Sequence, residues 1–310
     1  MSGRSRGVSV ALPSKRMRSV ILAASAIVTA SLFAFAQSSQ SEARQIVQEA
    51  VYNELHSSRG GHHYMYKDRE VTRKGSTIKE VIETPEGSLS RTLAINDRQL
   101  TATERDKDAE RLRKFANNPE ARRKKQQSDR EDDQRASALI RAFPDAFNYT
   151  FVGVEPGPAE NQLVHLKFEP NPNFDPPNRE TQVLVGMRGD MYIDKDAKRI
   201  AKVDGTLFRD VNFGWGILGK LDKGGRFLIE QRNIGDGRWE TVQTTLKFTG
   251  KILMIKPLNI DSNETLSDFR PVPSQLTTAR ALELLQKDEE VVAENGGSVK
   301  SSGTTNPKRP

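Results

Sequence analysis

The hydrophobic and polar positions between residues 181 and 257 form short apolar runs separated by turn-forming residues. The apolar runs lie at 183–185, 191–193, 227–229, 239–248 and 252–255. The breaks, each of which contains Gly or Asp, lie at 188–190, 194–196, 222–225, 235–237 and 249–251. Strands joined by such turns at short intervals are typical of an antiparallel meander. We therefore predict that this stretch forms the main part of an antiparallel sheet.

The residues before the meander predict a helix followed by more strands. Apolar residues recur at helical spacing over residues 41–57, at Ile46, Val47, Ala50, Val51 and Leu55. Polar residues at alternate positions then predict three strands with one solvated face, at 63–72, 76–84 and 88–95. Two further strands are predicted at 147–154 and 163–168. The chain therefore mixes helices with an antiparallel sheet, which is the α+β class.

A highly charged helical stretch at 103–143 interrupts the strands. We predict that Asn117-Asn118-Pro119 divides it into two helices, because proline disfavours helical backbone at the residue before it. Most of the stretch mixes acidic and basic residues, which is typical of a solvated helix surface. Its last part carries an apolar stripe, Ala136, Leu139, Ile140 and Phe143, which is predicted to pack against another part of the fold. Pro144 is predicted to end the helix.

The two ends of the chain are predicted to lie outside the folded domain. Residues 1–36 combine basic residues at 15–18, a short apolar run at 20–35 and a small-residue motif, Ala34-Phe35-Ala36. This order is typical of a secretory signal peptide, and an uncleaved N-terminal anchor is the alternative. A helix is predicted over 274–290, and a polar tail rich in Gly and Ser over 296–310. The predicted organisation is a signal at 1–36, one domain at 37–270 and a C-terminal helix with its tail at 271–310.

The basic balance of the chain belongs mainly to this leader. The formal net charge is +7, and residues 1–36 contribute five of these charges and contain no acid. A nucleic-acid partner is therefore not expected, although Arg122-Arg123-Lys124-Lys125 is a local basic run. The chain has no cysteine, which excludes disulfides, a thiol nucleophile and a lipid-acceptor cysteine. We expect an exported protein that is soluble after cleavage.

Three short motifs have simpler explanations than the functions they suggest. Residues 214–219 match GxGxxG, but a strand is predicted after them, whereas a dinucleotide site needs a helix there. We therefore expect these glycines to serve close packing or a bend in the sheet. The Arg-Gly-Asp at 188–190 is explained by a hairpin turn. The four histidines, His56, His62, His63 and His165, lack metal-ligand spacing. With no catalytic constellation in the sequence, we expect no enzymatic activity, no metal and no cofactor.

Apolar surface is the remaining functional signal. Large apolar residues collect in the meander, and we predict that ten of them line an apolar cavity for a lipid-like ligand. They are Met191, Ile193, Val203, Leu207, Phe213, Trp215, Phe227, Ile229, Trp239 and Met254. The alternative is that they form an ordinary sheet core under helices. Residues 252–255 are apolar at every position, so both faces of that strand are predicted to be covered.

Part of the meander resembles a known family. Gly189-Asp-Met-Tyr-Ile-Asp194, a turn, and then Arg199-Ile-Ala-Lys-Val203 is similar to a signature of the periplasmic lipoprotein-carrier superfamily, which includes Lol-type outer-membrane lipoprotein sorting proteins. Tyr192 stands where Trp is usual, and the family's functional arginine has no match. The resemblance covers residues 42–270 and implies a curved antiparallel half-barrel, closed by helices over a cavity that holds acyl chains.

The sequence thus predicts a periplasmic, non-enzymatic carrier or binder of lipid or acylated protein. The helices over 42–57 and 136–143 are the predicted lid. The alternative is an envelope signalling or scaffold module of the same fold, which contacts a protein partner through the charged segment 103–135. A hydrolase would need a catalytic constellation that the sequence lacks.

Overall fold

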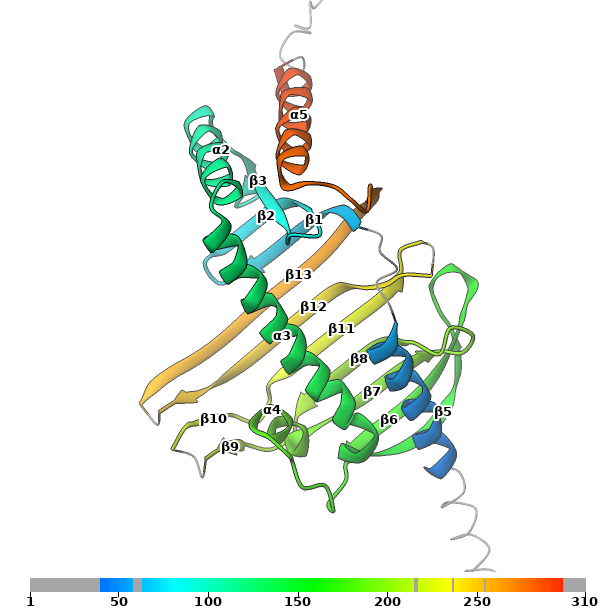
Figure 1. The fold of residues 1–310 in the computed structure, drawn as a ribbon. Coiled ribbons are helices and arrows are strands. Elements are labelled where there is room, and N and C mark those ends of the chain that lie inside the picture. The colour runs from blue at the N-terminus through cyan, green and yellow to red at the C-terminus, as the bar shows by residue number, and fades with distance from the viewer. Residues whose placement is uncertain (1–39, 58–62, 215–216, 236, 254, 298–310) are drawn as a thin grey trace, which may run out of the picture.

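The computed structural model describes residues 40–57, 63–214, 217–235, 237–253 and 255–297. They form one curved antiparallel sheet of thirteen strands with helices beside it (Figure 1). The strand order is β4-β3-β2-β1-β13-β12-β11-β8-β7-β6-β5, while β9 and β10 form a hairpin beside β12. The predicted α+β class and curved antiparallel sheet are confirmed. The predicted leader and most of the predicted C-terminal tail lie outside the described residues.

The strands follow each other along the chain with mostly short connections. Their bounds are β1 His63–Thr72, β2 Gly75–Ile82, β3 Leu89–Ile95, β4 Arg98–Gln99, β5 Phe147–Pro156, β6 Gln162–Pro170, β7 Met187–Asp194, β8 Ile200–Leu207, β9 Val211–Phe213, β10 Gly219–Leu221, β11 Arg226–Asn233, β12 Trp239–Ile252 and β13 Lys256–Val272. The helices span residues 40–56, α2 Ala102–Ala116, α3 Pro119–Ala146, α4 Arg179–Gln182 and α5 Thr278–Gly297, with short 3₁₀ helices η1 Pro158–Glu160 and η2 Val183–Gly186.

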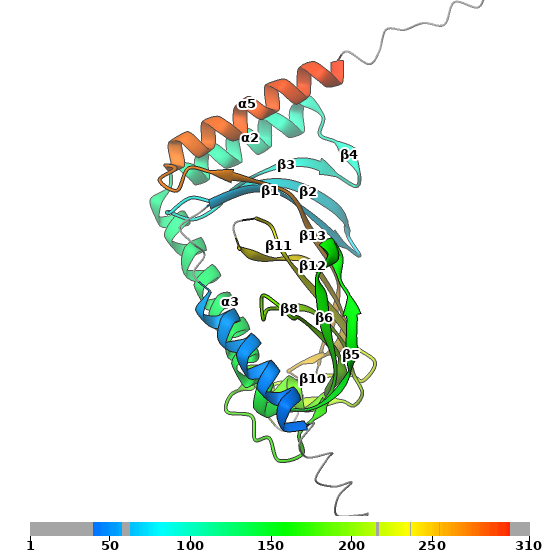
Figure 2. The same ribbon diagram turned by 90° about the vertical axis from the view of Figure 1, so that its right-hand side faces the viewer.

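Helices cover opposite faces of the sheet at its two ends (Figure 2). Helix 40–56 and the last turns of α3 pack on the concave face of β5–β8 and β11, and they form the larger apolar core with it. Helices α2 and α5 pack on the other face of the sheet, over β1–β3, around Met65, Ile82 and Leu89. Adjacent strand residues point to opposite faces, so Met65 enters this second core while Tyr64 and Tyr66 face the concave side. The sheet between the two cores is therefore less covered.

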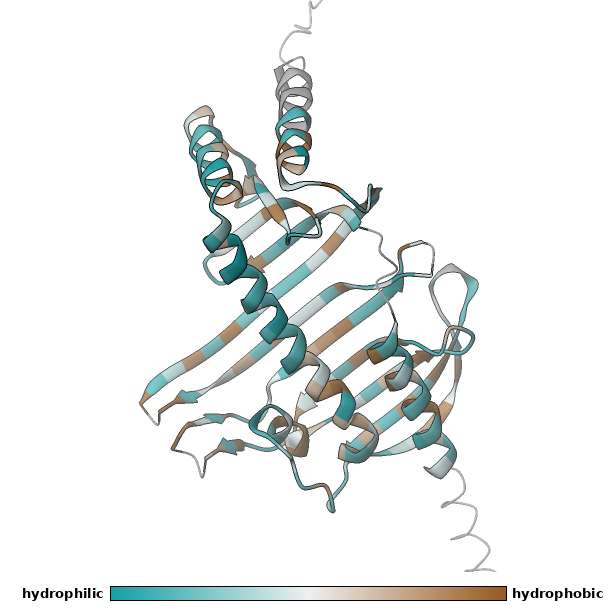
Figure 3. Ribbon diagram, in the orientation of Figure 1, coloured by the Kyte–Doolittle hydropathy of each residue, from teal (hydrophilic) through white to brown (hydrophobic). Residues whose placement is uncertain are grey.

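Helix α3 crosses the concave face and is anchored at its two ends (Figures 1 and 2). At its start, Arg122 donates to Glu86 and to Thr278 Oγ1, and at its end Leu139, Ile140 and Phe143 pack on the larger core. Between these anchors, residues 123–136 are exposed apart from the half-buried Gln126 and Asp129. Figure 3 shows the same division, with the middle of α3 hydrophilic and its last turns more hydrophobic.

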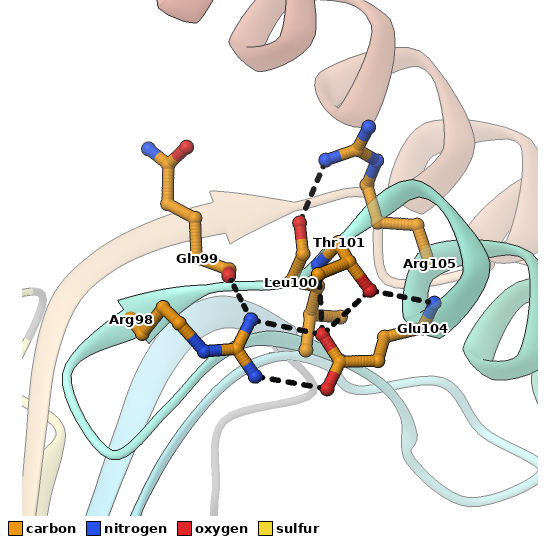
Figure 4. A network of polar contacts seen from close by, with 6 residues as sticks. All are labelled: Arg98, Gln99, Leu100, Thr101, Glu104 and Arg105. Carbon is orange, nitrogen blue, oxygen red and sulfur yellow. Dashed lines mark hydrogen bonds and ion pairs between the residues drawn. The ribbon is translucent and has the colours of Figure 1, made fainter.

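The break between the two charged helices and the start of each are local. Asn118 caps α3 by accepting from the Ala121 amide at 3.0 Å, and Pro119 occupies the first turn, where its missing amide costs little. Thr101 caps α2 in a capping box with Glu104, whose carboxylate also binds Arg98 (Figure 4). The division predicted at residues 117–119 is confirmed. Pairs such as Lys125 with Asp129 confirm the predicted solvated surface of α3.

Several predicted strand boundaries are wrong. Residues 183–185 form η2 rather than a strand, and 188–190 lie inside β7 rather than in a turn. Position 189 requires glycine, because a Cβ there would lie 2.1 Å from the Asp204 carbonyl oxygen of β8. Residues 249–251 continue β12, where Gly250 lets β10 approach closely. Tight strand packing, rather than turn formation, is the role of both glycines.

Two other predictions about ends are also wrong. Pro144 lies within α3, which continues to Ala146 because Ala142, Phe143 and Ala146 pack into the larger core and outweigh the lost hydrogen bond. The prediction of a covered strand over 252–255 is also wrong for the three residues described there. Ile252 ends β12, Leu253 has a left-handed φ of 49°, and Ile255 is 86% exposed, so these three residues lie at the exposed end of the β12–β13 hairpin.

Candidate ligand groove beneath helix α3

A pocket of about 390 Å³ lies where the end of helix 40–56, α3 and the β11–β12 hairpin meet. We call it the rim pocket. Its walls include apolar and charged side chains, among them Leu55, Ile140, Trp239, Glu54, Arg199, Gln231, Arg238 and Glu240. Its volume falls in the range of small-molecule sites.

One wall of the rim pocket is built on a buried ion pair. Arg199 donates to Glu54 through Nε at 3.0 Å and Nη2 at 2.9 Å, and the two side chains are 8% and 13% exposed. Glu54 also accepts from Gln231 Nε2 at 3.0 Å, and the Arg199 guanidinium lies 6.0 Å from the Trp239 ring centre. These contacts hold the end of helix 40–56 against the sheet.

The turn between β7 and β8 places Arg199. The Asp194 carboxylate accepts from the Asp196 and Ala197 amides at 3.0 and 2.8 Å, which closes the turn between β7 and β8. Lys198 takes a left-handed φ of 52°, and the Asp194 amide donates to the Arg199 carbonyl at 2.9 Å. The predicted turn at 194–196 is therefore confirmed, and it delivers Arg199 to Glu54.

The opposite wall is fixed by Arg238. Its Nε donates to Glu240 at 2.6 Å, and its Nη2 donates to both carboxylate oxygens of Glu83 at 3.1 and 3.2 Å. Its guanidinium lies 4.7 Å from the centre of the Tyr64 ring. The named charges on both walls are therefore paired within the protein. Gln231 Oε1 is buried and accepts no hydrogen bond within the described part of the chain.

The floor of the concave face changes from apolar to polar along one cross-strand row. The register places Met191, Val203, Ile229, Thr244, Glu264 and Glu70 side by side across six strands. Met191 and Val203 are buried under helices, whereas Ile229, Thr244 and Glu264 are half-buried beneath the span of α3. We use the name α3 groove for this half-buried floor together with the rim pocket; the cavity itself is the rim pocket.

The far end of the α3 groove is acidic. Glu264 faces Glu70 directly across β13 and β1, and Asp68 is the next concave-side residue of β1. Burial, and then the charges of Asp68 and Glu70, raise the pKa of Glu264 above its usual value. Burial also raises the pKa of Asp68. Lys79 of β2 lies opposite Asp68, and its charge partly offsets the rise in the pKa of both carboxyls. This end is therefore polar, whereas an acyl chain would lie nearer Ile229.

The structure separates the ten predicted cavity residues. Five are buried in the larger core: Met191, Ile193, Val203, Leu207 and Phe227. Phe213 packs partly against that core, Ile229 lies on the groove floor and Trp239 lines the rim pocket. Trp215 and Met254 lie outside the described residues. For the five core residues, the space around them is filled by the protein's own side chains, and contact of any of the ten with a ligand stays a prediction.

A second pocket, of about 640 Å³, lies on the outer face of the sheet and shares Gln231 and Trp239 with the rim pocket. His165 lies near it, with Nδ1 2.7 Å from Glu155 and Nε2 2.7 Å from Asp190, and its ring stacks on Tyr192 at 4.4 Å. Within the described ranges, no three His, Asp or Glu residues are grouped as a metal site. The sequence could not have predicted this cluster, because its residues come from three different strands and form no motif along the chain.

Comparison with known proteins identifies no family. No family model matches the chain, and no curated protein matches it. A solved structure of a DUF1329 family protein from Desulfovibrio piger is 12% identical, covers 74% of this chain and 92% of that chain, and gives a TM-score of 0.26. So low a score carries no argument, and the resemblance to the lipoprotein-carrier superfamily stays a prediction. In the part of the chain described, no helix is long and apolar enough to cross a membrane.

Proposed function

We propose that the protein is an exported, non-enzymatic binding protein that holds a lipid or an acylated protein in the α3 groove. The observation that carries the proposal is the arrangement of α3, which is anchored at both ends and solvated over a half-buried concave floor. An ordinary covering helix buries an apolar stripe along its whole length. In α3 that stripe is confined to the last turns, so apolar side chains of its middle do not cover the floor of the sheet, and in this proposal a ligand does.

The composition of the groove favours an amphiphile. Leu246 and Ile260 pack against the edge of the larger core, and Ile229 lies opposite its member Val203. These three side chains would contact an acyl chain. The rim pocket would take the polar end, and the unpartnered Gln231 Oε1 would accept from an amide or hydroxyl there. Each methylene removed from water contributes about 0.8 kcal/mol, so even a short buried segment would support reversible binding.

Binding of an acyl chain can be tested with a matched pair of substitutions. Thr244 lies on the concave floor, and Thr245 is its neighbour on the opposite face of β12. Both are half-buried. Thr244→Trp should fill the groove and weaken binding of a fluorescent fatty acid or acyl-peptide at least about tenfold, whereas Thr245→Trp should not.

The ligand itself is identified by organic extraction and mass spectrometry of the purified protein. Circular dichroism of both variants checks that the fold is kept. Equal loss of binding in the two variants, or the absence of any co-purifying or titratable lipid, would overturn the proposal.

A scaffold role is the second candidate, because Arg123, Lys124 and Lys125 are exposed in the first turns of α3. A protein partner with an acidic surface would then bind the outer side of α3. Replacing these three residues by Gln should abolish such an interaction without changing acyl binding, and the reverse result would favour the carrier role.

A further inference from the structure

Two hairpin ends at one corner of the sheet expose large aliphatic side chains. Ile217 and Leu218 lie in the turn between β9 and β10 and are 59% and 36% exposed. Ile252, Leu253 and Ile255 lie at the β12–β13 end and are 39%, 60% and 86% exposed. We call these five residues the hairpin-tip patch. Figure 3 shows hydrophobic colour at the ends of both hairpins.

Strand pairing holds the two tips side by side. β10 pairs with β12, with Gly219 opposite Ile252, and the Leu253 amide donates to the Leu218 carbonyl at 3.2 Å. Gly250 permits the close approach, because a Cβ there would lie 2.0 Å from the Lys220 carbonyl oxygen. The patch is therefore a built feature of the fold, although its residues come from two separate segments.

Basic residues flank the hairpin-tip patch and prevail in the segments that carry it. The segments 208–225 and 249–258 contain Arg209, Lys220, Lys223, Lys251 and Lys256, against two acids. Both acids, Asp210 and Asp222, bind Lys220, at 2.9 and 3.1 Å. Lys251 and Lys256 directly flank the apolar residues of the β12–β13 end and are exposed. The tips thus combine apolar ends with a net positive charge.

We propose that the hairpin-tip patch docks the protein on an anionic lipid surface. Apolar side chains at the tips would enter the region between headgroups and acyl chains, while the flanking lysines stay at the level of the anionic headgroups. A second copy of the chain is a poorer occupant, because it would place the flanking lysines of one tip against those of the other. A stable protein interface also buries more than about 1,000 Å², which is large for five residues on two turns.

Docking of this kind does not require the α3 groove to hold a lipid. The patch lies at the end of β12 and β13, away from the rim pocket at the opposite end of β12. A membrane-docked scaffold would use it equally well. Its failure and the failure of the proposed acyl binding are therefore distinguishable, because each site has its own variants and its own assay.

Sedimentation with vesicles tests the proposal. The chain from Gln37 onward retains every element described and lacks the apolar leader, so it is mixed with vesicles of phosphatidylcholine and phosphatidylglycerol. We expect the wild type to sediment with them, and Leu253→Asp with Ile255→Asp to reduce the bound fraction at least about tenfold. Lys251→Gln with Lys256→Gln should weaken binding to these vesicles at low salt and have little effect on pure phosphatidylcholine vesicles.

Val152→Asp is the matched control, because Val152 is 47% exposed on the edge strand β5, away from the tips. It should bind vesicles as the wild type does. The proposal is overturned if the wild type does not sediment, or if Val152→Asp loses binding as fully as the tip variant. Size-exclusion chromatography that shows a dimer dissolved by the tip variant would also overturn it, in favour of self-association.

Discussion

The Glu54–Arg199 pair should contribute far more stability than a similar ion pair on the same helix. Glu54→Ala leaves the Arg199 guanidinium, in a side chain only 8% exposed, without its carboxylate. Removing one partner of a buried pair costs about 3–5 kcal/mol, because the other charge stays desolvated. The lost bond from Gln231 adds to this cost. We therefore expect Glu54→Ala to destabilise the protein by at least about 3 kcal/mol.

The control is the pair between Arg44 and Asp145, which also joins helix 40–56 to the rest of the fold. Its side chains are 47% and 66% exposed, so Asp145→Ala should cost about 0–1 kcal/mol. Urea unfolding followed by circular dichroism at neutral pH measures both. With a slope of about 3 kcal/mol per molar, the Glu54→Ala midpoint should fall by about 1 M.

Two further results would separate burial from other causes. Added salt should shrink the Asp145→Ala effect and leave the Glu54→Ala effect nearly unchanged, because buried pairs are poorly screened. Replacing both partners, Glu54→Leu with Arg199→Met, should recover much of the loss, since no unpaired charge remains. Equal destabilisation by Glu54→Ala and Asp145→Ala would refute the reasoning.

Three other predictions concern pH and strand packing. Because the pKa of Glu264 is raised, its contribution to stability is present below its usual pKa of 4.5 and is lost as pH rises through the raised value. Glu264→Gln should therefore be more stable than wild type at pH 7 and equal to it in acid. Equal unfolding midpoints at pH 7 would contradict this. Hydrogen bonds from Arg98 and Thr101 lower the pKa of Glu104 to about 2. Glu104→Ala should therefore lower the melting temperature at pH 7, and the difference from wild type should vanish as pH falls toward 2. A difference in melting temperature that stays constant with pH would argue against this. Gly250→Ala should abolish the protection of β10 amides from hydrogen exchange, because the new Cβ would clash with β10. Gly153→Ala, whose Cβ would have no atom within 4 Å, should not. Protection kept in both variants would show that β10 and β12 are not tightly packed.

The elements of this fold follow largely from local sequence. The strand predicted at 63–72 has the same bounds as β1. Alternation of apolar and polar residues indicates a strand with one buried face, and this does not depend on which element covers that face. The break at 117–119 follows from the capping side chain of Asn118 and the fixed φ of Pro119, which act within a single turn. Helix 40–56 likewise follows from its apolar spacing, and its predicted face is the one that enters the core.

The candidate site could be predicted only in part. Trp239 and Ile229 lie at the α3 groove, but Glu54, Arg199 and Gln231 come from three distant segments and carry no shared sequence signal. Met191 and Val203 look like cavity residues in the sequence, since apolar strand positions are the same whether a helix or a ligand covers them. Covering by helix 40–56 decides that they are core.

The sequence by itself therefore determined the α+β class, most elements and the absence of a recognisable catalytic motif, because these depend on residues within a few positions of one another. Tertiary structure alone decided that β13 pairs with β1, that α3 spans the concave face, and that Ile252, Leu253 and Ile255 lie at an exposed tip rather than in a covered strand. The physical reason is that an apolar pattern specifies burial but not its partner. The partner is set by long-range strand pairing. Gly189 and Gly250 contribute to it because their missing side chains let a neighbouring strand approach, and neither glycine forms a turn.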